Sequence, residues 1–165
     1  MASGRVRVGA ALAGVAGVIL GIFVSSALEG AQLAAPLQAR RRVIRPEKAP
    51  NAGLPLSPGI LVGSTLYVSG HLGRDPVTSQ LVSGGIAAET RQALTNIRDV
   101  LRTAGMDLAD VASVTAYIAS FQDFAAFNGV YREFFPSDQP ARATVQVAAL
   151  NAGARIELQV IAVKP

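Results

Sequence analysis

Alternation of apolar and polar residues predicts most strands of this chain. Residues 60–62 and 66–68 are short β-rich runs separated by Gly63-Ser64, which is typical of a hairpin. Residues 111–118 alternate strictly, with apolar side chains on one face and Ser113, Thr115 and Tyr117 on the other. Two further alternating runs, residues 140–150 and 155–163, predict the last two strands.

Two segments instead carry apolar residues at helical spacing. Residues 86–104 form the first, and Gly105 follows in the position of a helix C-cap. Residues 123–135 form the second, with Asp123 suited to its N-terminus and Pro136 after its end.

The predicted order is therefore ββαβαββ, an α+β fold. We expect a mixed, mostly antiparallel sheet with both helices packed on one face. The other face would carry semi-polar residues such as Thr115, Tyr117 and Thr144, and a partner subunit is its natural cover.

The last two strands carry the candidate chemistry. Arg142, Thr144 and Gln146 share one face of the first strand, and Glu157 lies near the start of the second. A hairpin through residues 151–153 would bring both charges to one end of the sheet. From spacing alone, an exposed surface ion pair of about 0–1 kcal/mol is an equal alternative.

An uncharged run over residues 8–28 follows Arg5 and Arg7. It predicts a signal peptide or membrane anchor over 1–34, then a basic, proline-containing linker with the start of the first strand over 35–50, and a folded domain over 51–165. An exported, periplasmic product or an inner-membrane anchor is expected ahead of a cytoplasmic one. Arg40, Arg41 and Arg42 argue the other way, because positive charges favour the cytoplasmic side.

Composition narrows the chemistry. The 165 residues include no cysteine and one histidine, His71, which excludes disulfides, thiol nucleophiles and histidine-based metal clusters or triads. The formal charge is +4, but from residue 51 onward eight basic residues face nine acidic ones. A nearly neutral domain is untypical of nucleic-acid binders.

Several ordered blocks resemble the Rid (reactive intermediate deaminase, YjgF) family. Residues 54–73, LPLSPGILVGSTLYVSGHLG, resemble its opening hairpin with an SG turn, and DFAAFNGVYREFF resembles its second helix. PARATVQVAAL and RIELQVIAV resemble its last two strands, in the same order. The similarity runs from about residue 44 onward.

The resemblance implies a chorismate-mutase-like fold assembled as a homotrimer, with active sites between subunits. It also implies hydrolysis of enamine or imine acids, such as 2-aminoacrylate and 2-iminopropanoate, to a 2-keto acid and ammonia, with no metal or organic cofactor. Arg142 would hold the substrate carboxylate through two parallel hydrogen bonds, which a lysine cannot supply. Glu157 would hold or deprotonate the attacking water.

Further positions carry over from the family one at a time. Ser69 and Gly70, in the SG turn, match pocket-lining positions, and Asn128 matches an asparagine that contacts substrate or ties down a loop. Thr144 replaces a common cysteine, and the resemblance implies that the backbone amide and carbonyl at this position bind the substrate. Leu56 replaces a common aromatic residue, so this position lacks a ring and a hydroxyl. His71 stands where glutamine is common and is expected to be structural.

Two other functions remain open from the sequence. The first is a non-catalytic module that binds small carboxylates or another protein. The second is RNA cleavage, also attached to this family, which the neutral domain argues against.

Overall fold

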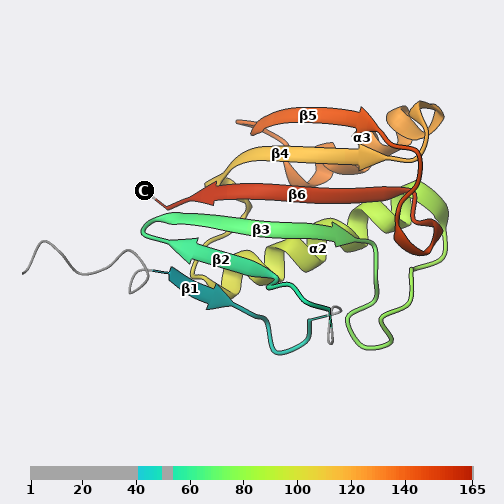
Figure 1. Cartoon of the computed structure of the whole chain (residues 1–165). Coiled ribbons are helices and arrows are strands. Elements are labelled where there is room, and N and C mark those ends of the chain that lie inside the picture. The colour runs from blue at the N-terminus through green and yellow to red at the C-terminus, as the bar shows by residue number, and fades with distance from the viewer. Residues whose placement is uncertain (1–40, 50–53, 165) are drawn as a thin grey trace, which may run out of the picture. The chain divides into compact units, whose positions relative to one another are not determined.

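The computed structural model describes residues 41–49 and 54–164 as one six-stranded sheet with two helices behind it (Figure 1). The strands are β1 Arg41–Ile44, β2 Gly59–Val62, β3 Thr65–Leu72, β4 Val111–Ile118, β5 Ala141–Gln146 and β6 Ile156–Val163. The helices are α2 Gly85–Thr103 and α3 Phe124–Phe134, with short 3-10 turns η2 Leu108–Asp110, η3 Phe121–Asp123 and η4 Asn151–Gly153. The predicted order is confirmed, with β1 as an additional strand at the front.

The strands lie in the order β1-β2-β3-β6-β4-β5, and only β4 and β5 are parallel. This corrects the predicted β5–β6 hairpin. α3 carries the chain from β4 to a parallel β5, as parallel neighbours require a crossover. β6 then pairs with the other edge of β4, so β4 separates the two strands that the sequence pattern had joined.

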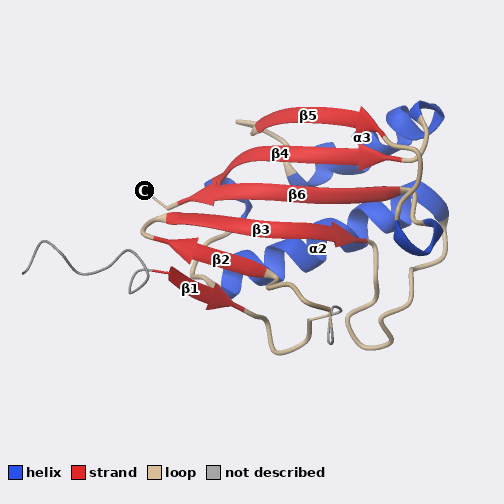
Figure 2. Ribbon diagram, in the orientation of Figure 1, coloured by secondary structure: helices blue, strands red, loops and turns tan. Residues whose placement is uncertain are grey.

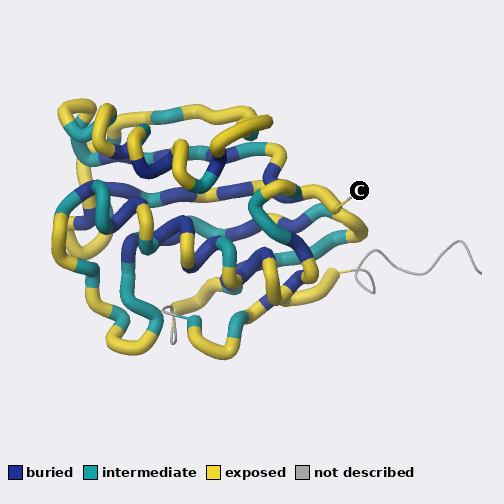
Figure 3. The backbone as a smooth tube through the Cα atoms, turned by 180° about the vertical axis from the view of Figure 1, so that it is seen from behind, coloured by how far each residue is buried: buried dark blue, intermediate teal, exposed yellow. Residues whose placement is uncertain are grey.

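Both helices cover the same face of the sheet, as predicted (Figure 2). The core lies between them and the inward residues of the central strands, which are fully buried. These residues include Leu66, Val114, Ala116, Leu158 and Val160 from the sheet and Leu94, Ile97 and Phe127 from the helices. Figure 3 shows this side of the molecule, with buried segments recurring along the strands and helices.

The other face of the sheet is open. It presents Tyr67, Val145, Ile161 and Val163, which are 36–50% exposed. Thr115 and Tyr117 lie on this face, as predicted. Thr144 does not, because it is aligned with buried Ala116 and faces the helices.

Local signals explain how α2 ends. Gly105 has φ +75°, and the N–H groups of Gly105 and Met106 donate to the carbonyls of Arg102 and Leu101. This pair of bonds is the Schellman arrangement, in which a glycine takes the left-handed position.

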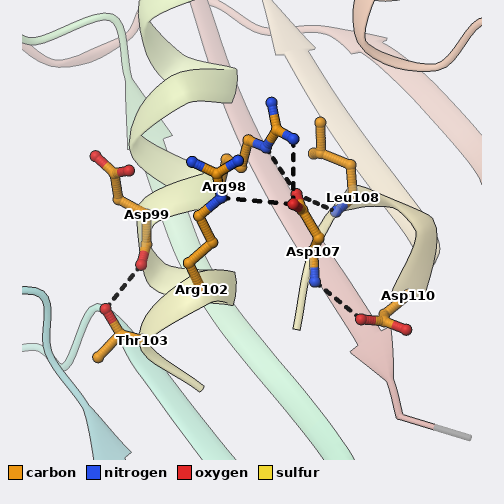
Figure 4. Close-up of polar contacts among 7 residues, drawn as sticks. All are labelled: Arg98, Asp99, Arg102, Thr103, Asp107, Leu108 and Asp110. Carbon is orange, nitrogen blue, oxygen red and sulfur yellow. Dashed lines mark hydrogen bonds and ion pairs between the residues drawn. The ribbon is translucent and has the colours of Figure 1, made fainter. Parts of the chain in front are cut away.

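The chain then turns at Asp107, which holds the junction between α2 and β4 together (Figure 4). Its carboxylate accepts hydrogen bonds from Arg98 Nε at 2.7 Å and from the Leu108 N–H, while its own N–H donates to Asp110. Arg98 lowers the pKa of Asp107 to about 2.

Candidate active site

Arg142 lies at the start of β5 on the face that the helices cover. Its backbone neighbour on β4 is Val114, which is buried against the helices. The guanidinium therefore meets α3, where its Nη2 donates a 2.8 Å hydrogen bond to Asn128 Oδ1. The predicted shared face of Arg142, Thr144 and Gln146 is confirmed by the strand register.

Three aromatic rings of α3 support the guanidinium. Its central carbon lies 4.4 Å from the ring centre of Tyr131, 4.9 Å from that of Phe127 and 5.9 Å from that of Phe124. Sequence reasoning missed this stack. The signal was present in DFAAFNGVYREFF, where the aromatic residues recur at helical spacing beside Asn128.

The contacts of Arg142 leave its charge uncompensated in the described part of the chain. Asn128 is neutral, and no carboxylate pairs with Arg142 among the described residues. Cation–π contacts hold a guanidinium without using up its N–H donors. Arg142 is therefore fixed in place with donors left for an anionic group.

Two buried hydroxyl groups lie beside this arginine. Tyr131 Oη and Thr144 Oγ1 are enclosed and have no hydrogen-bond partner in the described structure. Burial raises the pKa of Tyr131 to about 12, an effect that the nearby Arg142 charge opposes. The phenol is therefore neutral at physiological pH.

A groove runs along the surface at this point. Its lining residues come from α3 and the segment leading into β5: Asn128, Tyr131, Arg132, Gln139, Pro140 and Arg142. Of residues 41–49 and 54–164, none that lines it is acidic. We call this surface the arginine groove.

A second cluster forms where β3 bulges between Val68 and His71. Ser69 and Gly70 occupy the bulge, and the carboxylate of Glu157 on β6 lies directly over Gly70. A Cβ at position 70 would lie 2.8 Å from the carboxyl carbon of Glu157. Only glycine leaves this space, so the SG pair and Glu157 form one structural unit.

Ser69 also anchors the preceding loop. Its hydroxyl donates a 2.7 Å hydrogen bond to the Ser57 carbonyl. Leu56, which is 36% exposed, shares an open groove with Ser69 and Arg41. The structure thus brings Leu56, Ser69, Gly70 and Glu157 to one region.

His71 supports the bulge from beneath. It is buried, and its Nδ1 lies 2.8 Å from the Ser69 carbonyl oxygen. Burial lowers the pKa of His71, against the opposing effect of that hydrogen bond. A neutral buried ring is consistent with the predicted structural role.

The two clusters do not meet within one chain. Arg142 faces the helices, whereas Glu157 is aligned with Tyr117 and lies on the open face. Their Cα atoms are separated by two strand spacings and three residues along β4, about 14 Å. A surface ion pair between them in one chain is thereby excluded, and so is a catalytic pair within one chain.

No metal site is evident among residues 41–49 and 54–164. Within these ranges, no group of three or more His, Cys, Asp or Glu side chains is arranged to hold an ion. The absence of a metal or organic cofactor stays a prediction.

Comparisons with known proteins identify the relatives of this chain. The family model described as endoribonuclease L-PSP matches residues 46–164. A goat (Capra hircus) protein named 2-iminobutanoate/2-iminopropanoate deaminase is 49% identical over 124 residues, 75% of this chain and 90% of its own length. The human protein of the same name is 47% identical over the same shares of the two chains.

Solved structures agree with these sequence matches. A putative endoribonuclease from Thermotoga maritima superimposes with a TM-score of 0.73 at 39% identity, covering 75% of this chain and 98% of the other. The YjgF protein of E. coli gives 0.72 at 32% identity, covering 75% and 99%.

These findings correct the predicted localisation. The curated relatives are deaminases whose similarity supplies no sign of export. In the described ranges, no helix has the length and apolar character needed to cross a bilayer. The prediction of an exported or membrane-anchored protein is wrong on this evidence, and the run at 8–28 that prompted it lies outside the described residues.

A family model matches most of the chain, and the relatives are nearly half identical to it. Together these findings confirm the family resemblance that the strand and helix motifs indicated. The chain belongs to the Rid (YjgF) family, whose model is described as endoribonuclease L-PSP.

Proposed function

We propose that this protein is a deaminase that hydrolyses small 2-imino acids, of the 2-iminobutanoate and 2-iminopropanoate type, to 2-keto acids and ammonia. The observation that carries the proposal is Arg142, a fixed guanidinium whose only hydrogen-bond partner among the described residues is a neutral amide. The names of the goat and human relatives support the substrate class.

The proposed reaction requires only a positioned water and a group that accepts its proton. The iminium carbon of the substrate is electrophilic, so one placed water completes the attack and forms the new C–O bond. Glu157 accepts a proton from that water. Glu157 then returns this proton to the nitrogen of the carbinolamine. The C–N bond breaks and releases ammonia, while the remaining O–H proton passes to solvent and leaves the keto oxygen.

Arg142 orients the substrate in this scheme. A guanidinium binds a carboxylate through two parallel hydrogen bonds, which fixes both the position and the rotation of a small acid. Asn128 acts through Arg142 and is a positioning residue, since its amide oxygen already accepts from the guanidinium. Thr144 offers its backbone and its unpartnered hydroxyl beside the same site.

The complete site requires two chains. Within one chain Arg142 and Glu157 lie on opposite faces of the sheet, so we assign them to different subunits of a homotrimer. In this arrangement the open face of one subunit, which carries Glu157, packs against the β5 edge of its neighbour, which carries Arg142. One subunit supplies Arg142, and its neighbour supplies Glu157 with Ser69 and Gly70. Leu56 closes the second cluster without the ring or hydroxyl that is common at this position.

The test uses the full-length protein with 2-aminoacrylate, generated from serine by a dehydratase, and follows pyruvate release. Arg142→Ala should lose about 2–5 kcal/mol of transition-state binding. Glu157→Gln should lower kcat by about 10²–10⁴-fold while keeping the fold. Equal acceleration by wild type and Arg142→Ala would end the proposal. RNA incubated with the same preparations serves as the control for the activity in the family description, and it should stay intact.

A further inference from the structure

The arginine groove contains a second guanidinium that the proposed chemistry does not use. Arg132 lines the groove together with Arg142. It lies four residues after Asn128 on α3, and residues at this spacing are neighbours on one helix face, with Cβ atoms about 5–6 Å apart. Arg132 therefore lies one helical turn along α3 from Asn128, the residue that holds the Arg142 guanidinium.

Arg132 has no acidic partner in the described part of the chain. The acids of η3 and α3 are already engaged by other arginines: Asp123 by Arg155 at 3.2 Å, and Glu133 by Arg91. Asp138 does not line the groove.

Two positive charges in an acid-free groove repel one another, and an anion between them relieves that repulsion. A ligand with one carboxylate satisfies Arg142 alone. A ligand with a second carboxylate offers an anionic group to Arg132 as well.

We propose that this groove selects imino acids with a second carboxylate, such as 2-iminosuccinate, and that Arg132 is the residue that recognises it. The inference rests on the proposed function, because it assumes that Arg142 holds the first carboxylate. It narrows the substrate class to the imines of acidic amino acids. Within one chain, the groove residues other than the two arginines are uncharged. The acid that the proposed assembly brings near, Glu157 of the neighbouring subunit, is assigned to the attacking water and not to either arginine.

The experiment compares two four-carbon substrates that differ in the second carboxylate. An aspartate oxidase generates 2-iminosuccinate, and a dehydratase acting on threonine generates 2-iminobutanoate. The acceleration of keto-acid release over the spontaneous rate gives kcat/KM for each substrate with full-length wild type, Arg132→Gln and Arg132→Lys.

We expect wild type to prefer 2-iminosuccinate. Arg132→Gln should lower kcat/KM for this substrate by about tenfold, mainly through KM, and change 2-iminobutanoate by less than about twofold. Arg132→Lys should restore part of the loss, since it keeps the charge without the fork. The preference should weaken as salt is raised.

Arg102→Gln is the matched control, because it removes the same charge from an exposed helical position outside the groove. It should leave the ratio of the two substrates unchanged. If Arg132→Gln affects both substrates equally, or neither, the inference is overturned while the deaminase proposal stands. If wild type accelerates neither substrate, both fail.

Discussion

Arg142 is held by uncharged groups that do not neutralise its charge. The nearest of its three aromatic neighbours is Tyr131. The Tyr131 ring lies 4.4 Å from the guanidinium carbon, while its hydroxyl is buried without a partner in the described structure. The ring and the hydroxyl of Tyr131 therefore affect the stability of the protein in separable ways.

Tyr131→Phe keeps the ring and removes a buried hydroxyl that makes no hydrogen bond. The free energy of unfolding should rise by about 1 kcal/mol, because the desolvation cost of the hydroxyl is removed. Tyr131→Leu should instead lower it, through the loss of the aromatic contacts. Urea unfolding measures both. A clear loss of stability in Tyr131→Phe would mean that the hydroxyl has a partner in the assembled protein.

Gly70 determines where the Glu157 carboxylate lies. Gly70→Ala should displace this carboxylate, since a Cβ at position 70 would overlap it. A shift of about 1 Å in a catalytic group costs on the order of 10²-fold in rate, so kcat should fall steeply.

Gly129→Ala is the control for this change. It lies on α3 with no atom within 4 Å of an added Cβ, so activity should stay and stability should rise by up to about 1 kcal/mol. Normal turnover in Gly70→Ala would remove Glu157 from the mechanism.

At the scale of elements, periodicity predicted the strands and helices but not all of their partners. Alternation in Ala141–Gln146 correctly grouped Arg142 with Thr144 on one side of the strand, since side-chain direction is a local property. It did not show which face of the sheet this side joins: Thr144 was expected on the open face, and the structure places both residues on the face that the helices cover. The pairing of β5 with β4 depends on the α3 crossover, which joins residues far apart in sequence. The stack of Tyr131 under Arg142 depends on the same crossover and was missed for the same reason.

Asp107 stabilises the junction of α2 and β4 through its ionised form. Its pKa in the folded protein is about 2, below the ordinary value of 3.8. A lowered carboxyl pKa contributes stability that is present above pH 3.8 and is lost as pH falls toward 2.

Asp107→Asn should therefore flatten the pH dependence of stability between about pH 4 and 2. We expect a difference of about 1 kcal/mol, reduced from the full linkage value because the side chain is 42% exposed. Denaturant unfolding across this range is the measurement. Parallel pH curves for the two proteins would contradict the assignment, and Asp99→Asn on the neighbouring helix α2 is a suitable control.

At the scale of the whole molecule, the packing of subunits would explain both the open sheet face and the division of the proposed site. The face presents exposed apolar side chains, and the two halves of the proposed site lie on opposite sides of the sheet. Neither the number of subunits nor their packing follows from the periodicity of one chain, because that periodicity records only which side of a strand is apolar.

Ile161→Lys places a charge on this open face, where Ile161 is aligned with Tyr67 and Ser113. In the proposed homotrimer this face is buried, so light scattering should report a shift from trimer to monomer, because burying an unpaired lysine is costly. Deaminase activity should fall in parallel.

Val77→Lys adds the same charge to a side chain that is 76% exposed and outside the sheet, and it should change neither property. A fully active Ile161→Lys monomer would contradict the two-chain site.

The central place of β6 has a consequence for how the protein is made. β1, β2 and β3 on one side, and β4 and β5 on the other, are joined in the sheet only through this strand. The ribosome must therefore translate β6, which ends at Val163, before β3 and β4 can be joined in one sheet. Until β6 is made, the nascent chain exposes the unpaired edges of β3 and β4. Holdase chaperones can bind these edges until synthesis is nearly complete.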